Sequence, residues 1–458
     1  MKRLFILTGL LLLTGALFNR TIAQNRENQV REQSIKYQRL MAYIDAFYVD
    51  TVNLQKLTED AIIKALSDLD PHSVYITKEE VDEMNEPLEG GFFGIGIQFT
   101  ILRDTLAVVA IVPGGPSEKA GLMAGDRIVS VDGENIAGKK LSNTEVRKRL
   151  KGEEGTIVKV GVLRGHENMD FRIIRGKIPI YSIDATYMLD KTTGYIKLSR
   201  FAATTIDEFE EAVKKLQAQG MKDLILDLQT NGGGYMGAAI GIADHLLDGR
   251  KMIVYTDGVN SGRREEYSTP IGLLQGGRVV VLIDGNSASA SEIFAGAIQD
   301  NDRGTIVGRR SFGKGLVQQP IDFSDGSAIR LTIARYYTPS GRCIQRPYES
   351  GKDSKYEMDW LTRYEHGEFF SKDSIKLDEN LRYSTGLGRP VYGGGGIMPD
   401  VFVPQDTTGV SSYLIEVSNR GLIIQFSFQY TDRNRAKLSA FENEQDLLKY
   451  LRRQGIVE

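Results

Sequence analysis

The sequence predicts an α/β protein in which a mainly β module precedes an alternating core, with helical segments at both ends. Three patterns support this prediction. From Gly194 onward, strand-type and helix-type stretches alternate, which is typical of an α/β layer with crossover connections. Before that point, residues 90–177 combine short β-type runs with turn signals. At the two ends of the chain, residues 30–48 and 436–453 space their apolar side chains as amphipathic helices do.

The expected elements follow in chain order, each bounded by a change of period or by glycine and proline. The β module, residues 90–177, should contain short strands and one helix. The core that follows should alternate strands and helices and end with strand 279–283 and helix 293–299. The polar, irregular stretch 348–389 is expected to be an insertion. The predicted helices are 30–48, 54–66, one from about 78, 144–151, 206–219, 236–247, 293–299 and 436–453, and the predicted strands are 106–112, 127–131, 156–163, 194–198, 223–228 and 279–283.

Composition and charge bound the class of protein. A chain of 458 residues with 41% apolar and 26% charged residues is long enough for several globular domains. The net charge of -3 leaves no basic field that would concentrate nucleic acid, so no nucleic-acid partner is expected. Cys343 is the only cysteine, which excludes an intrachain disulfide. We interpret it as a small packed residue rather than a catalytic thiol.

The N-terminus has the order of a secretory signal. Lys2 and Arg3 precede an apolar run from Leu4 to Phe18, and small Ala23 closes the polar stretch that follows. The sequence therefore predicts a signal peptide over 1–23 and export across the inner membrane to the periplasm, with membrane association or secretion left open. The alternative is an uncleaved anchor, which the shortness of the run disfavours, since a spanning helix needs about 20 residues.

A binding groove is predicted in the β module. In Gly94-Ile95-Gly96-Ile97, the glycines allow successive backbone N–H groups to converge on an anion. Alone, such a motif is more typical of a tight strand entry. The block from Val112 to Gly133, with Pro116-Ser117-Glu118-Lys119-Ala120-Gly121-Leu122 and Gly125-Asp126, makes residues 91–175 resemble a PDZ domain. The resemblance implies that the Gly94 loop takes a peptide's terminal carboxylate, and that Val146 and Leu150 face the groove from helix 144–151.

The core carries a glycine run and a serine-rich turn, each after a predicted strand. Asp227-Leu228-Gln229-Thr230-Asn231-Gly232-Gly233-Gly234 closes one strand and opens a helix, a corner that stabilises negative charge. A phosphate cradle is the competing interpretation, but the P-loop spacing is absent. Asn286-Ser287-Ala288-Ser289-Ala290-Ser291-Glu292 places small residues where a hydroxyl can stand exposed. Ser289-x-x-Glu292 is also a capping box, and both interpretations can hold together.

A lysine in a glycine turn supplies a base. Lys314 lies in Phe312-Gly313-Lys314-Gly315, directly before a strand-type run. The four histidines (His72, His166, His245 and His366) occur in no recognisable catalytic motif. A serine enzyme built from these segments would therefore use lysine, a known variant of the serine triad.

Together the three segments, with Tyr392-Gly393-Gly394-Gly395-Gly396-Ile397-Met398-Pro399-Asp400, make the chain similar to the carboxyl-terminal processing (tail-specific) proteases. The resemblance implies that Ser289 is the nucleophile and that Lys314, 25 positions later (314 − 289 = 25), is the general base. It further implies that Gln318 orients the lysine and that the N–H groups of Gly233 and Ala290 form the oxyanion hole.

The same resemblance implies a crotonase-like core and peptide substrates with a free C-terminus. Asp300 matches an acidic position of the family that we interpret as supporting rather than catalytic. Two departures concern the glycine segment: Gln229 stands where the family usually has arginine, and Gly232 where it often has proline. The resemblance alone therefore leaves open how the oxyanion loop is held.

The implied mechanism needs a neutral lysine. The ordinary lysine pKa is ~10.4, so a neutral amine near pH 7 requires burial to lower the pKa by about 3, at a free-energy cost of roughly 4 kcal/mol. Ser289 would then attack the peptide carbonyl and form an acyl-enzyme, and neither a metal nor an organic cofactor is expected. The alternatives are a non-catalytic binding protein and an acyl-CoA enzyme. We leave open a homo-oligomer formed through the terminal helices.

These observations divide the chain into five predicted segments. They are a signal peptide (1–23), an N-terminal helical region (24–89), a PDZ domain (90–177), a Ser/Lys protease core with its insertion (178–405) and a C-terminal helical extension (406–458).

Overall fold

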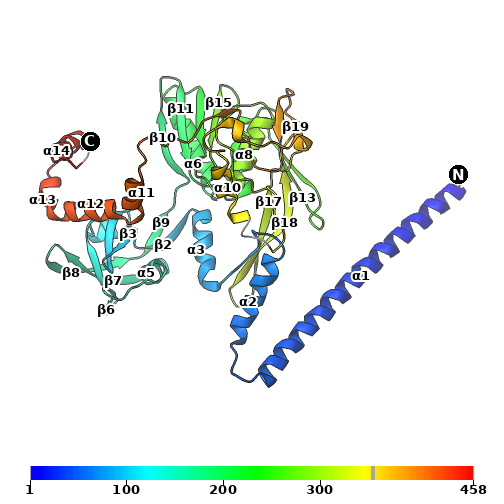
Figure 1. Ribbon diagram of the computed structural model, residues 1–458, viewed down its shortest axis with the longest axis horizontal. Helices are drawn as coiled ribbons and strands as arrows, with labels where there is room; N and C mark the ends of the chain where they lie inside the picture. The colour runs from blue at the N-terminus through cyan, green and yellow to red at the C-terminus, as the bar shows by residue number, and fades with distance from the viewer. Residues whose placement is uncertain (1, 352–355, 457–458) are drawn as a thin grey trace. The chain divides into compact units, whose positions relative to one another are not determined.

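The computed structural model describes residues 2–351 and 356–456. The chain divides into two compact units, which are described separately. The smaller contains the chain through Ile76, the stretch Pro320–Leu331 and a few residues from Tyr348; the larger contains nearly all the rest. Figure 1 labels the helices and strands along the chain.

The smaller unit is helical with a short strand. It contains helices α1 (Lys2–Phe47) and α2 (Leu54–Ser67), as predicted, and Asn53 caps α2 by accepting the Lys56 N–H. Strand β1 (Val74–Ile76) pairs antiparallel with residues 328–330 at the start of β18 (Ala328–Tyr337). In the part of the chain that was searched, no helix combines the length and apolarity needed to cross a membrane. The structure does not describe the side chains of residues 1–23, so the signal peptide expected there stays a prediction.

In the larger unit, helix α3 (Lys78–Glu89) leads into the β module. The left-handed Gly90, at φ 78°, ends this helix. A five-strand path in the order β3-β4-β5-β7-β8 forms the main sheet, β6 pairs with β5, and β2 pairs separately with β9. The strands are β2 (Gly91–Gly94), β3 (Ile97–Leu102), β4 (Thr105–Ile111), β5 (Arg127–Val131), β6 (Glu134–Asn135), β7 (Ile157–Arg164), β8 (Glu167–Ile174) and β9 (Gly176–Pro179), and the helices are α4 (Pro116–Ala120) and α5 (Asn143–Leu150).

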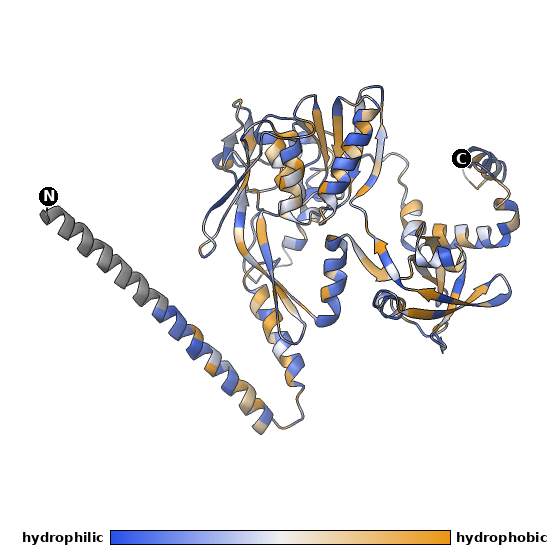
Figure 2. Cartoon of the chain, turned by 180° about the vertical axis from the view of Figure 1, so that it is seen from behind, coloured by the Kyte–Doolittle hydropathy of each residue, from blue (hydrophilic) through white to orange (hydrophobic). Residues whose placement is uncertain are grey.

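The α/β core follows and confirms the predicted alternation. Its sheet has the order β10-β11-β12-β15-β16-β21, and every pair after the antiparallel β10–β11 is parallel. Figure 2 colours the central strands of this sheet as hydrophobic, and they contribute fully buried side chains such as Leu226 and Val281. The elements are β10 (Ile183–Met188), β11 (Thr193–Leu198), α6 (Thr205–Ala218), β12 (Asp223–Asp227), α7 (Met236–Leu246), β15 (Val279–Ile283), α8 (Ala290–Asp300), β16 (Thr305–Gly308) and β21 (Val401–Phe402).

The parallel strands of this sheet bring two predicted motifs to one edge. Strands β12 and β15 are direct neighbours, with Asp227 opposite Leu282. The carboxyl ends of parallel strands lie on the same edge of a sheet, where α/β proteins place their ligands. The glycine run that follows β12 and the serine turn that follows β15 therefore start side by side.

Further strands and helices complete the larger unit. Strand β13 (Met252–Asp257) pairs with β14 (Arg264–Tyr267) and with the end of β18, which β17 (Leu316–Asp322) also joins. The described part of the predicted insertion, 348–389, contains α10 (Asp359–Glu365), two 3₁₀ turns, η1 (Lys372–Ser374) and η2 (Glu379–Leu381), and strand β19 (Arg382–Ser384). This strand pairs antiparallel with β20 (Pro390–Tyr392), directly after the insertion.

The C-terminal segment is helical as predicted, but in shorter pieces. It consists of α11 (Ser412–Asn419), α12 (Leu422–Arg433), α13 (Arg435–Leu438) and α14 (Glu444–Arg453). The single helix expected over 436–453 was wrong. Asn443 starts a new helix by accepting the Asp446 N–H, a local bond that competes with continuing the preceding helix.

Candidate active site

The turn between β15 and α8 presents Ser289. Its backbone has the unusual positive φ of 55°, which for a residue other than glycine is a strained conformation found often at active sites. Ser289 is partly exposed, whereas Ser287 and Ser291 are fully buried. Ser287 donates its hydroxyl to the Leu228 carbonyl and Ser291 donates to that of Asn231. The two flanking serines therefore hold the glycine run against the serine turn, and Ser289 is the serine left for chemistry.

Lys314 is directed toward Gln318. Its Nζ donates to Oε1 of Gln318 over 2.8 Å, which is the pairing that the family resemblance implied. Lys314 lies two residues before β17, and Gln318, four positions later, lies within that strand. Gly313 has a φ of 90°, and a Cβ there would lie 3.2 Å from both Arg346 and the backbone of Gly396. Only glycine fits this close approach, so the lysine turn is tightly enclosed.

Glu292 joins the serine turn to the lysine turn. Its carboxylate is 1% exposed and accepts four hydrogen bonds. One oxygen, Oε2, accepts the backbone N–H groups of Ser289 and Lys314, each over 2.9 Å. The other, Oε1, accepts the Gly313 N–H at 2.7 Å and the Ser311 hydroxyl. Burial raises the pKa of Glu292 above its ordinary value, and the four donors partly oppose that rise because they stabilise the ionised form.

Tyr336 makes a second link between the same turns. Its hydroxyl lies 2.6 Å from the Lys314 carbonyl oxygen and 3.1 Å from that of Ser289. The residue is 1% exposed at the end of β18, and burial raises the pKa of its phenol well above the ordinary value. The phenol therefore stays neutral and remains a hydrogen-bond donor. Glu292 thus holds the N–H groups of the serine and lysine turns, and Tyr336 holds their C=O groups.

The glycine run lies against Ser289 and Ala290. A Cβ on Gly233 would come within 2.9 Å of the Ser289 Cβ and 3.0 Å of the Ala290 nitrogen, so the two predicted oxyanion donors are neighbours. Ala290 opens α8, and the first N–H groups of a helix lack intrahelical acceptors. The Gly233 N–H, however, donates to Oδ1 of Asn231 over 2.9 Å. In this conformation only the Ala290 donor is open to an oxyanion.

Asn231 explains how the loop is held where the sequence departs from the family pattern. Its side chain is fully buried and also donates from Nδ2 to the Leu198 carbonyl at 2.9 Å. Its carbonyl accepts the Ala288 N–H and the Ser291 hydroxyl. At Gln229 the backbone carbonyl accepts Nζ of Lys197 over 2.6 Å. These bonds, rather than an arginine or a proline, fix the loop.

Three other residues that the sequence analysis named have surroundings that suit a structural rather than a catalytic role. Asp300 forms a buried ion pair with Arg342, 2.7 Å long, and accepts the Ser340 N–H, as suits a supporting residue. Burial raises the pKa of the Cys343 thiol, which disfavours a thiolate nucleophile. His245 pairs with Glu210 at 3.3 Å. Among the side chains that the structure describes, no cluster of His, Cys, Asp and Glu could hold a metal ion.

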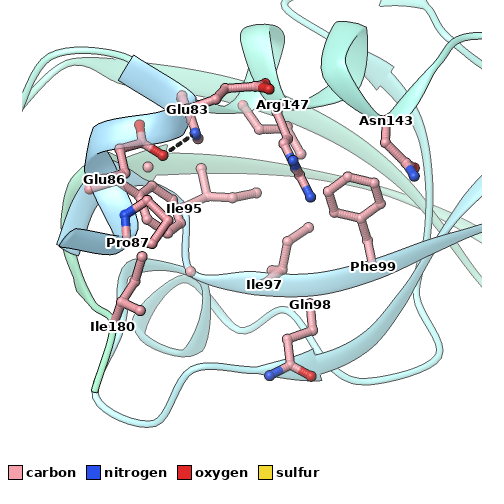
Figure 3. Close-up of a pocket in the computed structure, with 15 residues that line it drawn as sticks. Glu83, Glu86, Pro87, Ile95, Ile97, Gln98, Phe99, Asn143, Arg147 and Ile180 are labelled. Carbon is pink, nitrogen blue, oxygen red and sulfur yellow. Dashed lines mark hydrogen bonds and ion pairs between the residues drawn. The ribbon is translucent and has the colours of Figure 1, made fainter. Parts of the chain in front are cut away.

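The β module contains the predicted groove. A cavity of about 440 Å³ is lined by all four residues of the Gly94–Ile97 loop and by Leu150 of α5 (Figure 3). Val146, which was expected to face it, is not among the residues that line this cavity; it is buried in the core of the module at 2% exposure, as is Leu150 one helical turn later at 4%. Asn143, Arg147 and Leu150 of α5 line the groove, together with Lys151, which caps the C-terminus of this helix. Helix α3 also contributes Glu83, Glu86 and Pro87, which belong to no motif that predicted a groove.

Three stretches of the chain match models of protein families. Residues 192–351 match the family model "Peptidase family S41", residues 94–174 match "PDZ domain", and residues 413–457 match a family of unknown function, DUF8443. The chain is 35% identical over 352 residues to a carboxy-terminal-processing protease of Bartonella bacilliformis, with 75% of this chain and 80% of the relative covered.

Two further similarities were found. The carboxy-terminal processing protease CtpB of Bacillus subtilis is 31% identical over 350 residues, with 75% of this chain and 72% of the relative covered. The solved structure of a photosystem II D1 C-terminal processing protease is 28% identical, with a TM-score of 0.41, and covers 80% of this chain and 92% of its own.

Proposed function

Since this chain belongs to the carboxy-terminal processing proteases of peptidase family S41, with a PDZ domain at residues 94–174, we propose that it cleaves peptide bonds with Ser289 as nucleophile and Lys314 as general base. The observation that carries this proposal is the common anchoring of the two turns. Ser289 and Lys314 donate their backbone N–H groups to one oxygen of Glu292, and Tyr336 bonds to both of their carbonyls. Such fixed geometry favours catalysis by positioning.

In the proposed first step, neutral Lys314 takes the proton of the Ser289 hydroxyl as Oγ bonds to the substrate carbonyl carbon. The carbonyl electron pair moves to oxygen, and the Ala290 N–H donates to the resulting oxyanion. Lys314 then gives its proton to the leaving amine as the C–N bond breaks, which leaves an acyl-enzyme. A water molecule then gives a proton to Lys314 as its oxygen bonds to the ester carbon. Lys314 returns this proton to Ser289 Oγ as the ester C–O bond breaks, which releases the carboxylic acid and regenerates the serine hydroxyl.

Gln318 supports the role of Lys314 as a base. Its amide oxygen is an uncharged acceptor 2.8 Å from Nζ, so it orients the amine without the full negative charge that would favour the ammonium form. Gly233 would complete the oxyanion hole when its N–H leaves Oδ1 of Asn231 and donates to the substrate oxygen instead. Binding of substrate would then be coupled to a rearrangement of the glycine loop.

We propose that the PDZ groove captures the substrate's free C-terminus. PDZ domains add an extended peptide to a sheet edge, where main-chain bonds supply affinity and side-chain pockets supply specificity. The Gly94–Ile97 loop and Leu150 line the groove, and they offer converging N–H groups beside an apolar pocket.

Localisation and assembly are also proposals. The charged, apolar and small-residue order of residues 1–23 supports export to the periplasm, which N-terminal sequencing of the mature protein tests. Self-association through the terminal helices is supported by exposed apolar side chains on α11 and α12, including Tyr413, Ile424 and Phe426. Light scattering of the full chain and of a variant with these three replaced by serine tests it.

Digestion of a denatured exported protein, read by mass spectrometry, tests the proposed activity. The wild type should release peptides that the Ser289→Ala variant does not. If both variants release the same peptides, and contaminating protease is excluded, Ser289 is not the nucleophile. If neither releases any, the chain is a non-catalytic binding protein.

A further inference from the structure

Two cations lie one helical turn apart on the wall of the PDZ groove. Arg147 of α5 and Lys151, the residue that caps this helix and donates its backbone N–H to the Arg147 carbonyl, both line the groove. Figure 3 shows the Arg147 side chain extending from α5 toward β3, close to Ile97 and Phe99. Arg149 pairs with Glu134, whereas no described side chain forms an ion pair with the exposed Arg147. The Arg147 guanidinium therefore offers its donors to whatever occupies the groove.

The groove already holds carboxylates of the chain itself. Glu86 of α3 forms an ion pair with Lys151, and both side chains are largely buried, with 19% and 24% exposed. The Lys151 ammonium also lies 4.9 Å from the centre of the Phe92 ring. Glu83 lines the same groove. The charge of Lys151 is therefore paired with Glu86, whose carboxylate this end of the groove accommodates, and Arg147 is the cation of this wall that has no ion-pair partner among the described side chains.

The spacing of the two cations matches the spacing of groups on an extended peptide. Four residues of α-helix rise about 6 Å, which is the separation of Arg147 and Lys151 along α5. In a strand, two residues span about 6.6 Å, and their side chains point the same way. A peptide added along β3 with its terminal carboxylate at the Gly94–Ile97 loop, near Lys151, would place the side chain two positions earlier beside Arg147 and Phe99.

We propose, building on the capture of C-termini proposed above, that Arg147 is a specificity residue that selects an acidic side chain two positions before an apolar C-terminal residue. The apolar preference follows from Ile95, Ile97 and Leu150, which line the groove at its carboxylate end. The acidic preference follows from the Arg147 guanidinium, whose planar fork matches a carboxylate. The recognised substrates are thus protein tails whose last three residues are an acidic residue, any residue and an aliphatic residue.

Peptide binding to the full-length Ser289→Ala variant, followed by fluorescence polarisation at low salt, tests the proposal without cleavage. The probes are decapeptides that end in valine and carry glutamate, glutamine or lysine two positions earlier, each with a free or an amidated C-terminus. The glutamate peptide should bind about threefold to fivefold more tightly than the glutamine peptide, as expected for a solvent-accessible ion pair. The lysine peptide should bind more weakly than both, and high salt should shrink the differences.

Charge reversal on α5 provides the decisive comparison. In Arg147→Glu the order should invert, so that the lysine peptide binds more tightly than the glutamate peptide. Lys148→Glu, a reversal at the neighbouring position that does not line the groove, should keep the wild-type order. If free-ended peptides bind but the three residues give equal affinities in the wild type, the role of Arg147 is wrong while capture stands. If amidated peptides bind as well as free ones, the proposed capture itself fails.

Discussion

Ser289 and Lys314 donate their backbone N–H groups to the same carboxylate oxygen, Oε2 of Glu292, each over 2.9 Å. The two residues belong to turns that are 25 positions apart (314 − 289 = 25), yet a single buried atom sets their separation. Tyr336 adds a second common bond on the carbonyl side. Because both turns depend on these two side chains, we expect changes at Glu292 and Tyr336 to affect catalysis without touching the reacting groups.

Glu292→Gln should lower kcat/KM by roughly 100-fold. The substitution keeps the size of the side chain but turns one oxygen into an NH₂ group, which would face two N–H or O–H donors and leave them unpaired. Steady-state kinetics on an unfolded exported protein measure the effect. Glu211→Gln, at an exposed carboxylate of α6, removes the same charge and should keep the wild-type rate; an equal loss there would point to a general charge effect.

The same variant has a predicted pH dependence of stability. Because burial raises the pKa of Glu292 in the folded protein, this group contributes most to stability below its unfolded value, and the contribution is lost as the pH rises through the folded value. The destabilisation caused by Glu292→Gln, measured by urea unfolding, should therefore be larger at pH 4 than at pH 8. A destabilisation that grows with pH would mean that the four donors outweigh burial.

Tyr336→Phe should reduce kcat by about tenfold and leave KM nearly unchanged. The loss corresponds to one hydrogen bond of about 1 to 1.5 kcal/mol, shared between two carbonyls. Tyr337→Phe is the matched control, since Tyr337 stacks on Tyr255 with ring centres 4.8 Å apart on the other face of β18. Comparable losses in the two variants would show that Tyr336 acts through strand packing alone.

Alanine substitution of the three serines in the turn between β15 and α8 should have different effects on activity and stability. Ser289→Ala should lower kcat/KM by about 10⁴-fold or more, as loss of a nucleophile does. Ser287→Ala and Ser291→Ala should retain measurable activity but lose about 1 to 3 kcal/mol of stability. In the first variant the Asp284 N–H loses its acceptor, and in each variant one buried carbonyl, that of Leu228 or Asn231, loses one of its two donors. Activity and thermal unfolding of all three variants test this. An active Ser289→Ala protein would contradict the assignment.

Peptides with a free, apolar C-terminus should be cleaved with a kcat/KM about tenfold or more above that of their amidated forms. Hydrogen bonds to a charged acceptor are worth about 1.5 to 3 kcal/mol, and amidation removes them at the Gly94–Ile97 loop. Competition between matched free and amidated substrates gives the ratio directly. Equal values would mean that the groove does not recruit substrate through the carboxylate.

The sequence predicted the alternating core because strand and helix periods there are unambiguous. Strand β15 has the predicted bounds, 279–283. The family resemblance likewise singled out Ser289, Lys314 and Gln318 as site residues, and the last two are hydrogen-bonded in the structure. Local patterns of this kind are written within a few residues, so one sequence suffices to recognise them.

Contacts between distant segments were not predictable in this way. Glu292 was recognised only as a capping residue, because its bonds to Gly313 and Lys314 require the fold to bring the second turn to it. Tyr336 belongs to no recognisable motif, so the sequence did not single it out. Val146 was expected in the groove wall, whereas the wall contains its neighbour Arg147, which belongs to no motif. The rotation of α5, a helix of 8 residues, is poorly defined by periodicity. The engagement of the Gly233 N–H by Asn231 is likewise a property of the folded loop.

The general base is the central claim, and Lys314→Arg tests it most directly. Arginine keeps the positive charge and much of the length, but its guanidinium does not lose a proton in proteins. In the wild type, kcat/KM should fall as the pH falls through the pKa of Lys314, because the protonated amine cannot accept the Ser289 proton. The measurement is kcat/KM for wild type and Lys314→Arg across pH 5 to 10. We predict that the arginine variant is as inactive as Lys314→Ala at every pH; turnover at a tenth of the wild-type rate or more would contradict a neutral lysine base.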